Sequence, residues 1–317
     1  MDSKPLVSIV TVCMNRPDNL RPCLASIERN TSVSHEVLVA AYMFSEENLC
    51  AMRSEFPEVT FIRSDELRGF SENNNLALRQ ARGEYCFILN DDTEFSCPLI
   101  DTLVEDFRSL PESAAIVSPK IVNPDGTLQL CGRPAYPAYR YALQQWHLYR
   151  EPIDNVKGRT SVFGRVFPTF NITGACFLIK TEAFRSLGWF DETYYFTPED
   201  IALSTLARER GLGVYVDDSV SVVHKWKATA SRISPAVRPA AVKGSLLFFG
   251  RRSRAARLLL SLVVWLAEET KYLKACVRCA VRPSDKAELS RLTFKNIRAE
   301  IFSPLTPKEV FVKYYKG

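Results

Sequence analysis

Residues 83–95 read Gly-Glu-Tyr-Cys-Phe-Ile-Leu-Asn-Asp-Asp-Thr-Glu-Phe, and this stretch decides the fold. Its centre, from Tyr85 to Leu89, is apolar and aromatic, which is the composition of a buried strand. Asn90, Asp91 and Asp92 follow directly, so their side chains are expected at the carboxyl edge of a sheet. Ligands of open α/β sheets bind at this edge, and oxygen ligands there suit Mg²⁺ or Mn²⁺ holding a diphosphate. The alternative is an ordinary turn, because Asn and Asp favour turns in general.

Strands and helices alternate around this stretch. We expect strands at 6–12, 36–41, 60–63, 85–89 and 115–118, and helices at 17–30, 46–56, 71–82 and 98–110. A repeat of about 20–25 residues predicts a mostly parallel sheet with helices on both faces, a Rossmann-like α/β fold. Ser71 is expected to cap the third helix and Gly83 to end it. No G-x-G-x-x-G follows the first strand and no G-x-x-x-x-G-K-[ST] occurs, which excludes a dinucleotide site and a P-loop.

The pattern loosens between residues 121 and 170, where Pro, Gly, Tyr and Arg are frequent. We interpret this region as one that shapes a substrate site, with a plain surface excursion as the alternative. Regular elements return afterwards. We expect strands at 172–180, 214–216 and 220–223, and helices at 181–187, capped by Thr181, and at 198–210. The last strand leads to His224.

Seven short motifs occur in a fixed order between residues 6 and 230. They are Val7-Ser-Ile-Val-Thr11, Gly69-Phe70 with Asn75, Leu89-Asn-Asp-Asp-Thr93, Thr173-Gly-Ala175, Gly188-Trp-Phe-Asp-Glu192, Glu199-Asp200 and Val223-His224. In this order the chain resembles the inverting GT-A glycosyltransferases, the family that includes bacterial rhamnosyl- and galactofuranosyltransferases. The resemblance implies a nucleotide-sugar donor held by a divalent cation. It also implies transfer of the sugar to an acceptor hydroxyl with inversion at the anomeric carbon.

The resemblance assigns metal-binding roles to three residues. Asp92 matches the position nearest the metal, and a cation there would neutralise the departing diphosphate. Asn90 stands where the family often has an Asp, and its amide, a weaker ligand, would act through water. His224 matches a position where some relatives supply a further ligand, and imidazole suits Mn²⁺. A structural histidine at a strand end is the alternative for His224.

The resemblance also assigns the chemistry of the acceptor. Asp200 matches the family's general base, which takes the proton of the acceptor hydroxyl. Glu199 would bind the acceptor or orient Asp200. The alternative for this pair is two acidic residues placed by the helix dipole. Gly174 resembles a residue that lines the donor sugar, and Trp189 and Asp191 resemble residues that line the acceptor.

One position departs from the family. After the second strand the family usually has an Asp that reads the base or ribose, whereas this chain continues Val39-Ala-Ala-Tyr-Met-Phe-Ser-Glu46. We therefore expect nucleotide recognition elsewhere. The residues assigned to donor binding, besides Gly174, are Thr11, Cys13, Arg68, Asn75 and Asp91, with Asp65 as an alternative to Arg68.

Composition limits the class of protein. The net charge of +5 suits anionic membranes or phosphorylated ligands, and no motif for nucleic acid occurs. Nine cysteines, with only Cys276 and Cys279 closely spaced, fit a reducing cytosol and do not make a zinc site. The first residues do not read as a secretory signal, and no apolar run approaches the roughly 20 residues of a membrane span.

The chain is expected to divide near residue 240. Residues 1–240 would form the GT-A domain, with a nucleotide-sugar half over about 1–120 and an acceptor half over about 121–240. Residues 241–317 would form a helical extension. There, basic residues 251–257 precede the apolar run 258–267, a pattern typical of a helix lying on an anionic membrane. Packing on the catalytic domain, or on a second subunit in a homo-oligomer, is the alternative.

Three functional hypotheses follow. The main one is a metal-dependent inverting glycosyltransferase in the cytoplasm, at the inner face of the cell membrane. It would move rhamnose or another hexose from a dTDP-, UDP- or GDP-sugar to a surface-glycan or lipid-linked acceptor. The second is a non-catalytic glycan-binding or scaffold relative, favoured by the missing Asp and opposed by Asp92, Asp200 and His224. The third is a sugar-nucleotide pyrophosphorylase, which lacks support because residues 11–16 hold no Gly-rich basic loop.

Overall fold

The computed structural model describes residues 4–153, 156, 159–225 and 233–316. The chain divides into two compact units. The sheet unit comprises residues 1–135, 152–191 and 200–227, and the helical unit comprises 136–151, 192–199 and 228–317. The helical unit thus draws on three separate segments, whereas a single boundary near residue 240 was expected from the sequence.

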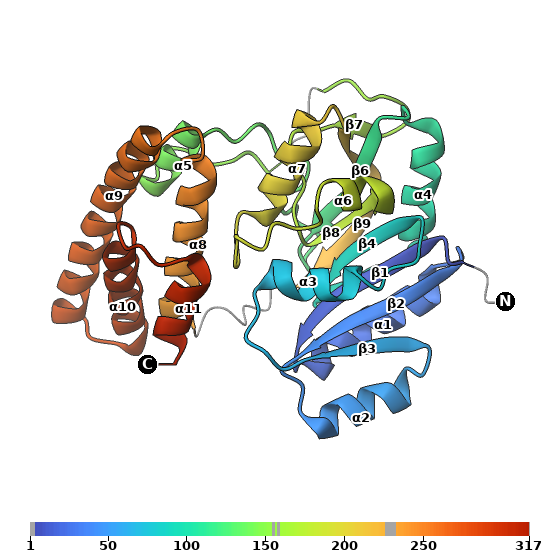
Figure 1. Cartoon of the computed structure of the whole chain (residues 1–317), viewed down its shortest axis with the longest axis horizontal. Helices are drawn as coiled ribbons and strands as arrows, with labels where there is room; N and C mark the ends of the chain where they lie inside the picture. Colours follow the sequence, from blue (N-terminus) through green and yellow to red (C-terminus); the bar gives the residue numbers. More distant parts are fainter. Residues whose placement is uncertain (1–3, 154–155, 157–158, 226–232, 317) are drawn as a thin grey trace. The chain divides into compact units, whose positions relative to one another are not determined.

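The sheet unit is built around one mixed sheet with the strand order β3-β2-β1-β4-β8-β6-β9-β5, and β7 pairs with β9 (Figure 1). Its strands are β1 (Val7–Met14), β2 (His35–Tyr42), β3 (Val59–Ser64), β4 (Tyr85–Asn90), β5 (Thr93–Glu94), β6 (Ala114–Val122), β7 (Val166–Pro168), β8 (Cys176–Lys180) and β9 (Gly213–His224). Its helices are α1 (Pro17–Asn30), α2 (Glu46–Glu55), α3 (Phe70–Leu78), α4 (Leu99–Ser109) and α6 (Thr181–Ser186), with α7 (Glu199–Glu209) starting at the unit boundary. The predicted α/β fold with helices on both faces is confirmed.

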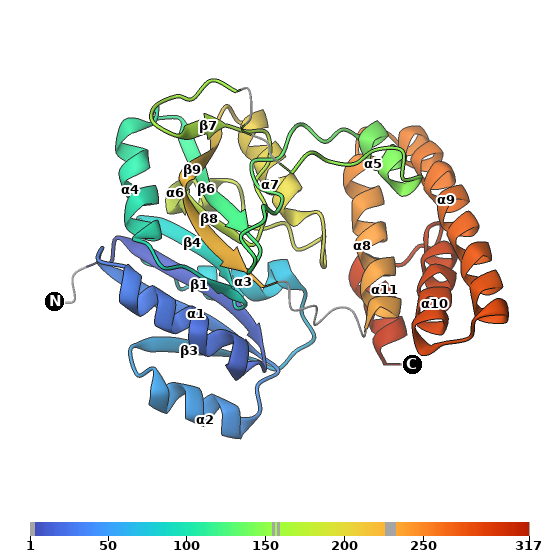
Figure 2. The same cartoon turned by 180° about the vertical axis from the view of Figure 1, so that it is seen from behind.

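Alternate residues of the central strands pack into two separate hydrophobic cores, one on each face of the sheet. Val7, Ile9, Phe87 and Leu89 pack with α1, α2 and α4, which cover one face of the sheet (Figure 2). Val10, Cys86 and Ile88 pack with α3, α6 and α7 on the other face. Both sides of β1 and β4 are therefore apolar, which explains their nearly continuous hydrophobic sequences.

The sheet is parallel only in part. β3, β2, β1 and β4 run parallel, as the strand–helix alternation predicts. β8 is antiparallel to both of its neighbours, β4 and β6. The chain enters β8 from the irregular stretch after β6 and not through a crossover helix, and only a crossover would impose the parallel direction.

Four local expectations were wrong, two of them at α3. Gly69, not Ser71, precedes α3, and its N–H donates to Glu72 Oε2 at 2.8 Å. α3 ends at Leu78, before the predicted end near residue 82, and the N–H groups of Arg82 and Gly83 instead donate to Ser8 Oγ.

Thr181 does not cap α6 either. It is the first residue of the helix, and its hydroxyl donates to Gly83 O at 2.8 Å. The two short strands expected before His224 are one strand, β9, with an irregularity in its pairing to β6 after Asp217. Asp217 accepts hydrogen bonds from the N–H and hydroxyl of Ser219 there, so a tight turn interrupts the ladder without ending the strand.

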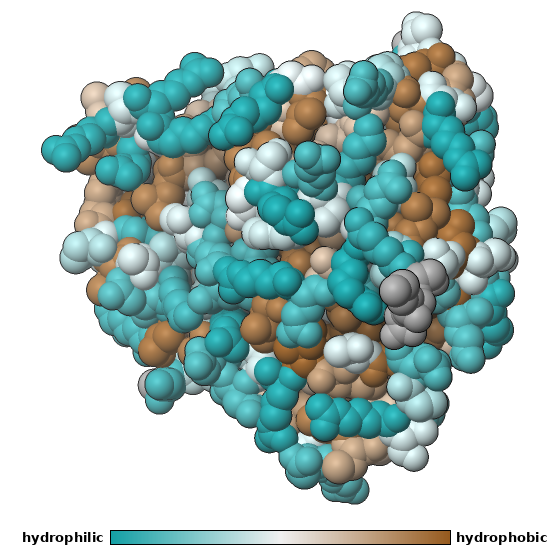
Figure 3. All heavy atoms as spheres, turned by 45° about the vertical axis from the view of Figure 1, so that its right-hand side comes forward, coloured by the Kyte–Doolittle hydropathy of each residue, from teal (hydrophilic) through white to brown (hydrophobic). Residues whose placement is uncertain are grey.

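The helical unit contains α5 (Ala138–Gln145), α8 (Ser234–Phe249), α9 (Arg254–Val281), α10 (Asp285–Glu300) and α11 (Pro307–Tyr315). Rings from several segments fill its interior, including Tyr141 stacked on Phe249 at 4.7 Å and Tyr195 against Phe311 at 5.0 Å. α5 was not predicted from the sequence. Among the described helices, none is both long enough and apolar enough to span a bilayer. The face seen in Figure 3 carries hydrophilic side chains interspersed with hydrophobic ones.

Candidate active site

The carboxyl edge of β4 brings Asp92 to His224. β4 ends at Asn90, and the two-residue strand β5 begins at Thr93, which lies opposite His224 on the antiparallel strand β9. The intervening turn holds Asp92 Oδ1 3.2 Å from His224 Nε2. Both side chains are about nine-tenths buried, at 11% and 9% exposure. A short reversal of the chain therefore joins two residues that are far apart in sequence.

Gln129 fixes the orientation of the His224 ring. The Gln129 amide nitrogen donates to His224 O at 2.7 Å and to Asn123 Oδ1 at 2.8 Å, which fixes the orientation of the amide. Its oxygen, Oε1, therefore faces His224 Nδ1, at 2.8 Å. Because an amide oxygen only accepts, Nδ1 carries a proton, and in the neutral imidazole Nε2 then holds the lone pair. Asn90 Nδ2, 3.4 Å from Nε2, is placed to donate to it.

This arrangement suits a cation. Asp92 Oδ1 and His224 Nε2 stand 3.2 Å apart, close enough for one cation to contact both. A ring nitrogen whose partner N–H is held by a neighbouring acceptor is also the usual state of a histidine ligand. Within the described residues, no three His, Cys, Asp or Glu side chains gather as a metal cluster. The chain thus offers Asp92 and His224, with Asn90 beside them, and a ligand's phosphate oxygens would complete the coordination.

Asp91 contacts Cys13 at the end of β1. Burial raises the pKa of Asp91 to about 6, while the hydrogen bond from Cys13 lowers the pKa and the charge of Asp92 raises it further. Cys13 is fully buried, and its thiol also lies 3.5 Å from Arg16 O. Asp91 is therefore held next to the first strand.

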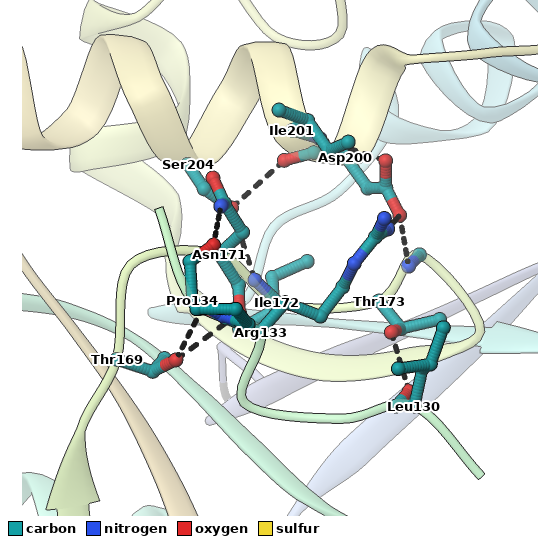
Figure 4. A network of polar contacts seen from close by, with 11 residues as sticks. Leu130, Arg133, Pro134, Thr169, Asn171, Ile172, Thr173, Asp200, Ile201 and Ser204 are labelled. Carbon is teal, nitrogen blue, oxygen red and sulfur yellow. Dashed lines mark hydrogen bonds and ion pairs between the residues drawn. The ribbon is translucent and has the colours of Figure 1, made fainter. Parts of the chain in front are cut away.

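Asp200, the expected base, lies in a network of N–H donors (Figure 4). Asp200 Oδ2 accepts from Gly174 N at 3.2 Å and lies 3.4 Å from Arg133 Nη1, while Oδ1 accepts from Ile201 N at 2.7 Å. The Asp200 and Arg133 side chains are only 14% and 15% exposed. Hydrogen bonds to a charged group contribute about 1.5–3 kcal/mol each, so the carboxylate is held in one orientation.

Two short segments connect the Asp92–His224 pair with Asp200. Asn90 N donates to Ala175 O at 2.9 Å. Gly174, the residue before Ala175, donates its N–H to Asp200 Oδ2. Thr173 Oγ1 donates to Leu130 O at 2.6 Å, next to Gln129, which holds His224 (Figure 4). Segments 129–133 and 173–175 therefore place both carboxylates at the same edge of the sheet.

The other predicted site residues lie around this edge or inside it. Asn75 is buried and exchanges two hydrogen bonds with the backbone of Phe190, at 2.9 and 3.1 Å, so its amide positions the segment that carries Trp189 and Asp191. Trp189 has a φ of 65° and packs on Phe184 at 5.2 Å.

Asp191 is exposed. The Arg68 guanidinium donates to Ser64 Oγ and Glu66 Oε2. Thr11 is fully buried in β1. Cys13 is fully buried as well, so neither residue is open to a donor in this structure. Glu199 is buried and belongs to the helical unit.

Gln129 and Arg133 were not predicted from the sequence. Both lie in the irregular region 121–170, where no periodic pattern marks which polar residues turn inward. Their roles arise from contacts with residues 67 or more positions away. The only sequence signal was the length of the irregular stretch itself.

The strand order and the helices on both faces of the sheet are those of the GT-A fold. Two solved structures share the fold. The structure of GalNAc-T7 with UDP, GalNAc and Mn²⁺ matches with a TM-score of 0.60 at 17% identity, covering 95% of this chain and 57% of that chain. The mannosyltransferase PcManGT from Pyrobaculum calidifontis, in complex with GDP-Man and Mn²⁺, matches with a TM-score of 0.55 at 16% identity, covering 99% and 88%.

The family model "Glycosyl transferase family 2" matches residues 8–188, and the chain belongs to this family. The O-antigen biosynthesis protein RfbC of Myxococcus xanthus is 30% identical over 233 residues, which are 71% of this chain but 18% of that protein. The N-acetylglucosaminyl-diphospho-decaprenol L-rhamnosyltransferase of Mycobacterium tuberculosis is 24% identical over 239 residues, covering 71% of this chain and 78% of that protein. The resemblance to this family found in the sequence is confirmed.

Proposed function

We propose that the chain is a metal-dependent inverting glycosyltransferase that moves a hexose from a nucleotide diphosphate to an acceptor hydroxyl. The observation that carries the proposal is the convergence of the Asp92–His224 pair and Asp200 on one sheet edge through segments 129–133 and 173–175. One half of that edge suits a cation with its diphosphate, and the other half holds a fixed carboxylate.

Asp92 and His224 would hold the divalent cation, Mn²⁺ or Mg²⁺, with Asn90 beside them. The bound cation would act as a Lewis acid on the diphosphate oxygens. The chain's own contribution is preorganisation: Gln129 keeps the Nε2 lone pair of His224 directed at the site, and β5 keeps Asp92 against it.

Asp200 would take the proton of the acceptor hydroxyl as that oxygen attacks the anomeric carbon. The bond from the anomeric carbon to the diphosphate oxygen breaks on the opposite face, so the configuration inverts. Gly174 and Arg133 would hold the carboxylate in line, and positioning of this kind supplies a large part of the rate. Trp189 and Asp191, on the segment held by Asn75, would contact the acceptor.

The donor and acceptor are proposed from the relatives. The rhamnosyltransferase name of one relative favours a deoxyhexose donor such as dTDP-rhamnose, with UDP- and GDP-sugars as alternatives. The name of that relative, and that of the O-antigen protein, favour a lipid-linked or surface-glycan acceptor. We place the enzyme in the cytoplasm at the inner face of the cell membrane, where such acceptors are built.

The base is tested with Asp200→Asn, because this change keeps the shape of the side chain and removes its ability to take a proton. We expect transfer to fall at least 1,000-fold, roughly the contribution of a positioned base. Donor affinity, measured by calorimetry with Mn²⁺ present, should change less than threefold. Asp18→Asn, at a side chain that is 97% exposed on α1, is the matched control. Equal losses of transfer and of donor binding would contradict the base role.

The donor is tested by thermal stabilisation. Nucleoside diphosphates are compared with and without Mn²⁺, because a ligand that binds the native state raises the melting temperature by mass action. The expected result is stabilisation by one base in particular and only with the cation. Stabilisation that is equal with and without Mn²⁺ would contradict the metal-dependent reading.

A further inference from the structure

Helix α9 exposes an apolar face along most of its length. The exposed side chains, called here the outer stripe, are Leu258, Leu259, Leu262, Leu266, Leu273, Val277 and Val281. Each is between 44% and 70% exposed. The opposite side of the same helix buries Leu260, Val264 and Ala267 against the other helices of the unit. An amphipathic helix normally turns polar side chains outward, so the stripe indicates an apolar surrounding on that side.

Cations stand at both ends of the stripe. Arg254 and Arg257 open α9, and no acidic residue lies in its first turn. The positive end of the helix dipole repels arginines at this place, so an isolated protein gains nothing by putting them there. Within the described residues, neither arginine has a carboxylate within 4 Å. Lys274 and Arg278 are exposed near the other end.

A cavity of about 500 Å³ adjoins the first turn of α9. Arg254 and Arg257 line it on one side, and Leu246, Phe302 and Leu305 form an apolar wall. Lys243 also lines it, but its ammonium group is engaged by backbone carbonyls, those of Glu300 at 3.1 Å and Ile301 at 3.4 Å among them. The two arginines are therefore the cations left to meet a ligand. Leu258 belongs both to the cavity and to the outer stripe.

An indole borders the same surface. Trp146 follows α5, is 38% exposed, and donates its Nε1–H to Val263 O of α9 at 3.3 Å. Leu143 on α5 is also 38% exposed. Tryptophan side chains with one polar contact and an exposed apolar body are typical of the boundary between water and lipid.

We propose that this face of the helical unit binds the anionic phospholipids of a bilayer surface. Arg254 and Arg257 would receive a lipid phosphate, the apolar wall of the cavity would receive the adjoining acyl chain, and the outer stripe would lie among the acyl chains. The proposal does not depend on the reaction catalysed by the sheet unit.

Charge favours a membrane over a second copy of the chain. α9 is basic at both ends, and its two acidic residues are engaged, Glu268 with Lys271 and Glu269 with Arg298. A pair of stripes, parallel or antiparallel, would therefore bring arginines and lysines together without acidic partners on α9. An anionic lipid surface supplies the opposite charge along the whole helix.

The test measures sedimentation of the full chain with vesicles. Vesicles of phosphatidylcholine with 30% phosphatidylglycerol are compared with phosphatidylcholine alone. We expect binding to the anionic vesicles, and an Arg254→Gln/Arg257→Gln variant should partition about 30-fold less, as expected for two charges at an anionic surface. Lys286→Gln/Lys295→Gln removes two exposed charges from α10 of the same unit and should partition within twofold of wild type.

Two further measurements can overturn the proposal. Leu259→Asn/Leu266→Asn should lose vesicle binding while its melting temperature stays near that of wild type, because both side chains are exposed; full binding by this variant contradicts the proposal. In lipid-free solution, sedimentation equilibrium should give the same mass for wild type and this variant. A dimer that only the leucine substitutions dissociate, without vesicle binding, would make the stripe a subunit interface. Stabilisation of wild type by inorganic phosphate, dependent on the two arginines and without vesicle binding, would make the cavity a free-phosphate site.

Discussion

Replacing Gln129 tests the tautomer of His224 and with it the cation site. Gln129→Met keeps the length of the side chain and removes the oxygen that accepts the Nδ1–H of His224. The imidazole proton is then free to move to Nε2, which lies 3.2 Å from Asp92 Oδ1. A hydrogen bond from Nε2–H to the carboxylate would use the two atoms that the cation needs, so cation affinity must fall.

The expected loss of cation affinity can be estimated because Gln129 contacts the ring of His224, the proposed metal ligand. Loss of a partner that orients a histidine ligand typically lowers metal affinity 10–100-fold. This corresponds to about 1.4–2.7 kcal/mol of binding free energy. The competing hydrogen bond to Asp92 has a similar value, about 1.5–3 kcal/mol, because one partner is charged. The two estimates agree, and neither requires a change of the fold.

The assay measures free Mn²⁺ by electron paramagnetic resonance in the presence of a nucleoside diphosphate, and it does not depend on activity. Gln129→Glu keeps an oxygen toward Nδ1 and is expected to bind Mn²⁺ more tightly than Gln129→Met. Gln80→Met, at an exposed position, is the control for the substitution itself. Wild-type affinity in Gln129→Met, with an unchanged melting temperature, would refute the assignment of His224 as a ligand with its proton on Nδ1.

Three other predictions concern the sheet unit. Burial, the charge of Asp217 and a hydrogen bond with Asp217 raise the pKa of Asp106. The folded state therefore binds the Asp106 proton more tightly than the unfolded state, and the protein loses stability as the pH rises. Asp106→Asn should raise the urea midpoint more at pH 8 than at pH 5, and an equal rise at both pH values would contradict this prediction. A Cβ at Gly83 would stand 2.5 Å from the backbone nitrogen of Ser8 in β1. Gly83→Ala should therefore lower the free energy of unfolding, measured in urea, by about 1–3 kcal/mol. An unchanged free energy of unfolding would contradict the close packing. Arg133→Met should lower kcat with little change in donor affinity, because its guanidinium positions Asp200; a loss confined to donor affinity would exclude that role.

Much of the sheet unit could be predicted from the sequence because its signals are local. The apolar stretches of β1 and β4 are long enough to mark strands buried on both faces. Helices α1 and α2 begin and end within a residue of their predicted bounds, since Pro17 and the acidic first turn of α2 act within one turn of chain. The direction of β8 could not be predicted, because no residue within it distinguishes a parallel from an antiparallel neighbour.

Periodicity and motif spacing are properties of short segments, so the α/β architecture, the family and the acidic residues at the end of β4 can be predicted without coordinates. The contacts of Asp92 with His224, of Gln129 with His224 and of Arg133 with Asp200 are visible only in the folded chain. The tertiary structure also decided which leucines of α9 face outward. These contacts join segments that are far apart in the chain. They form only when the whole unit packs, so no local sequence pattern predicts them.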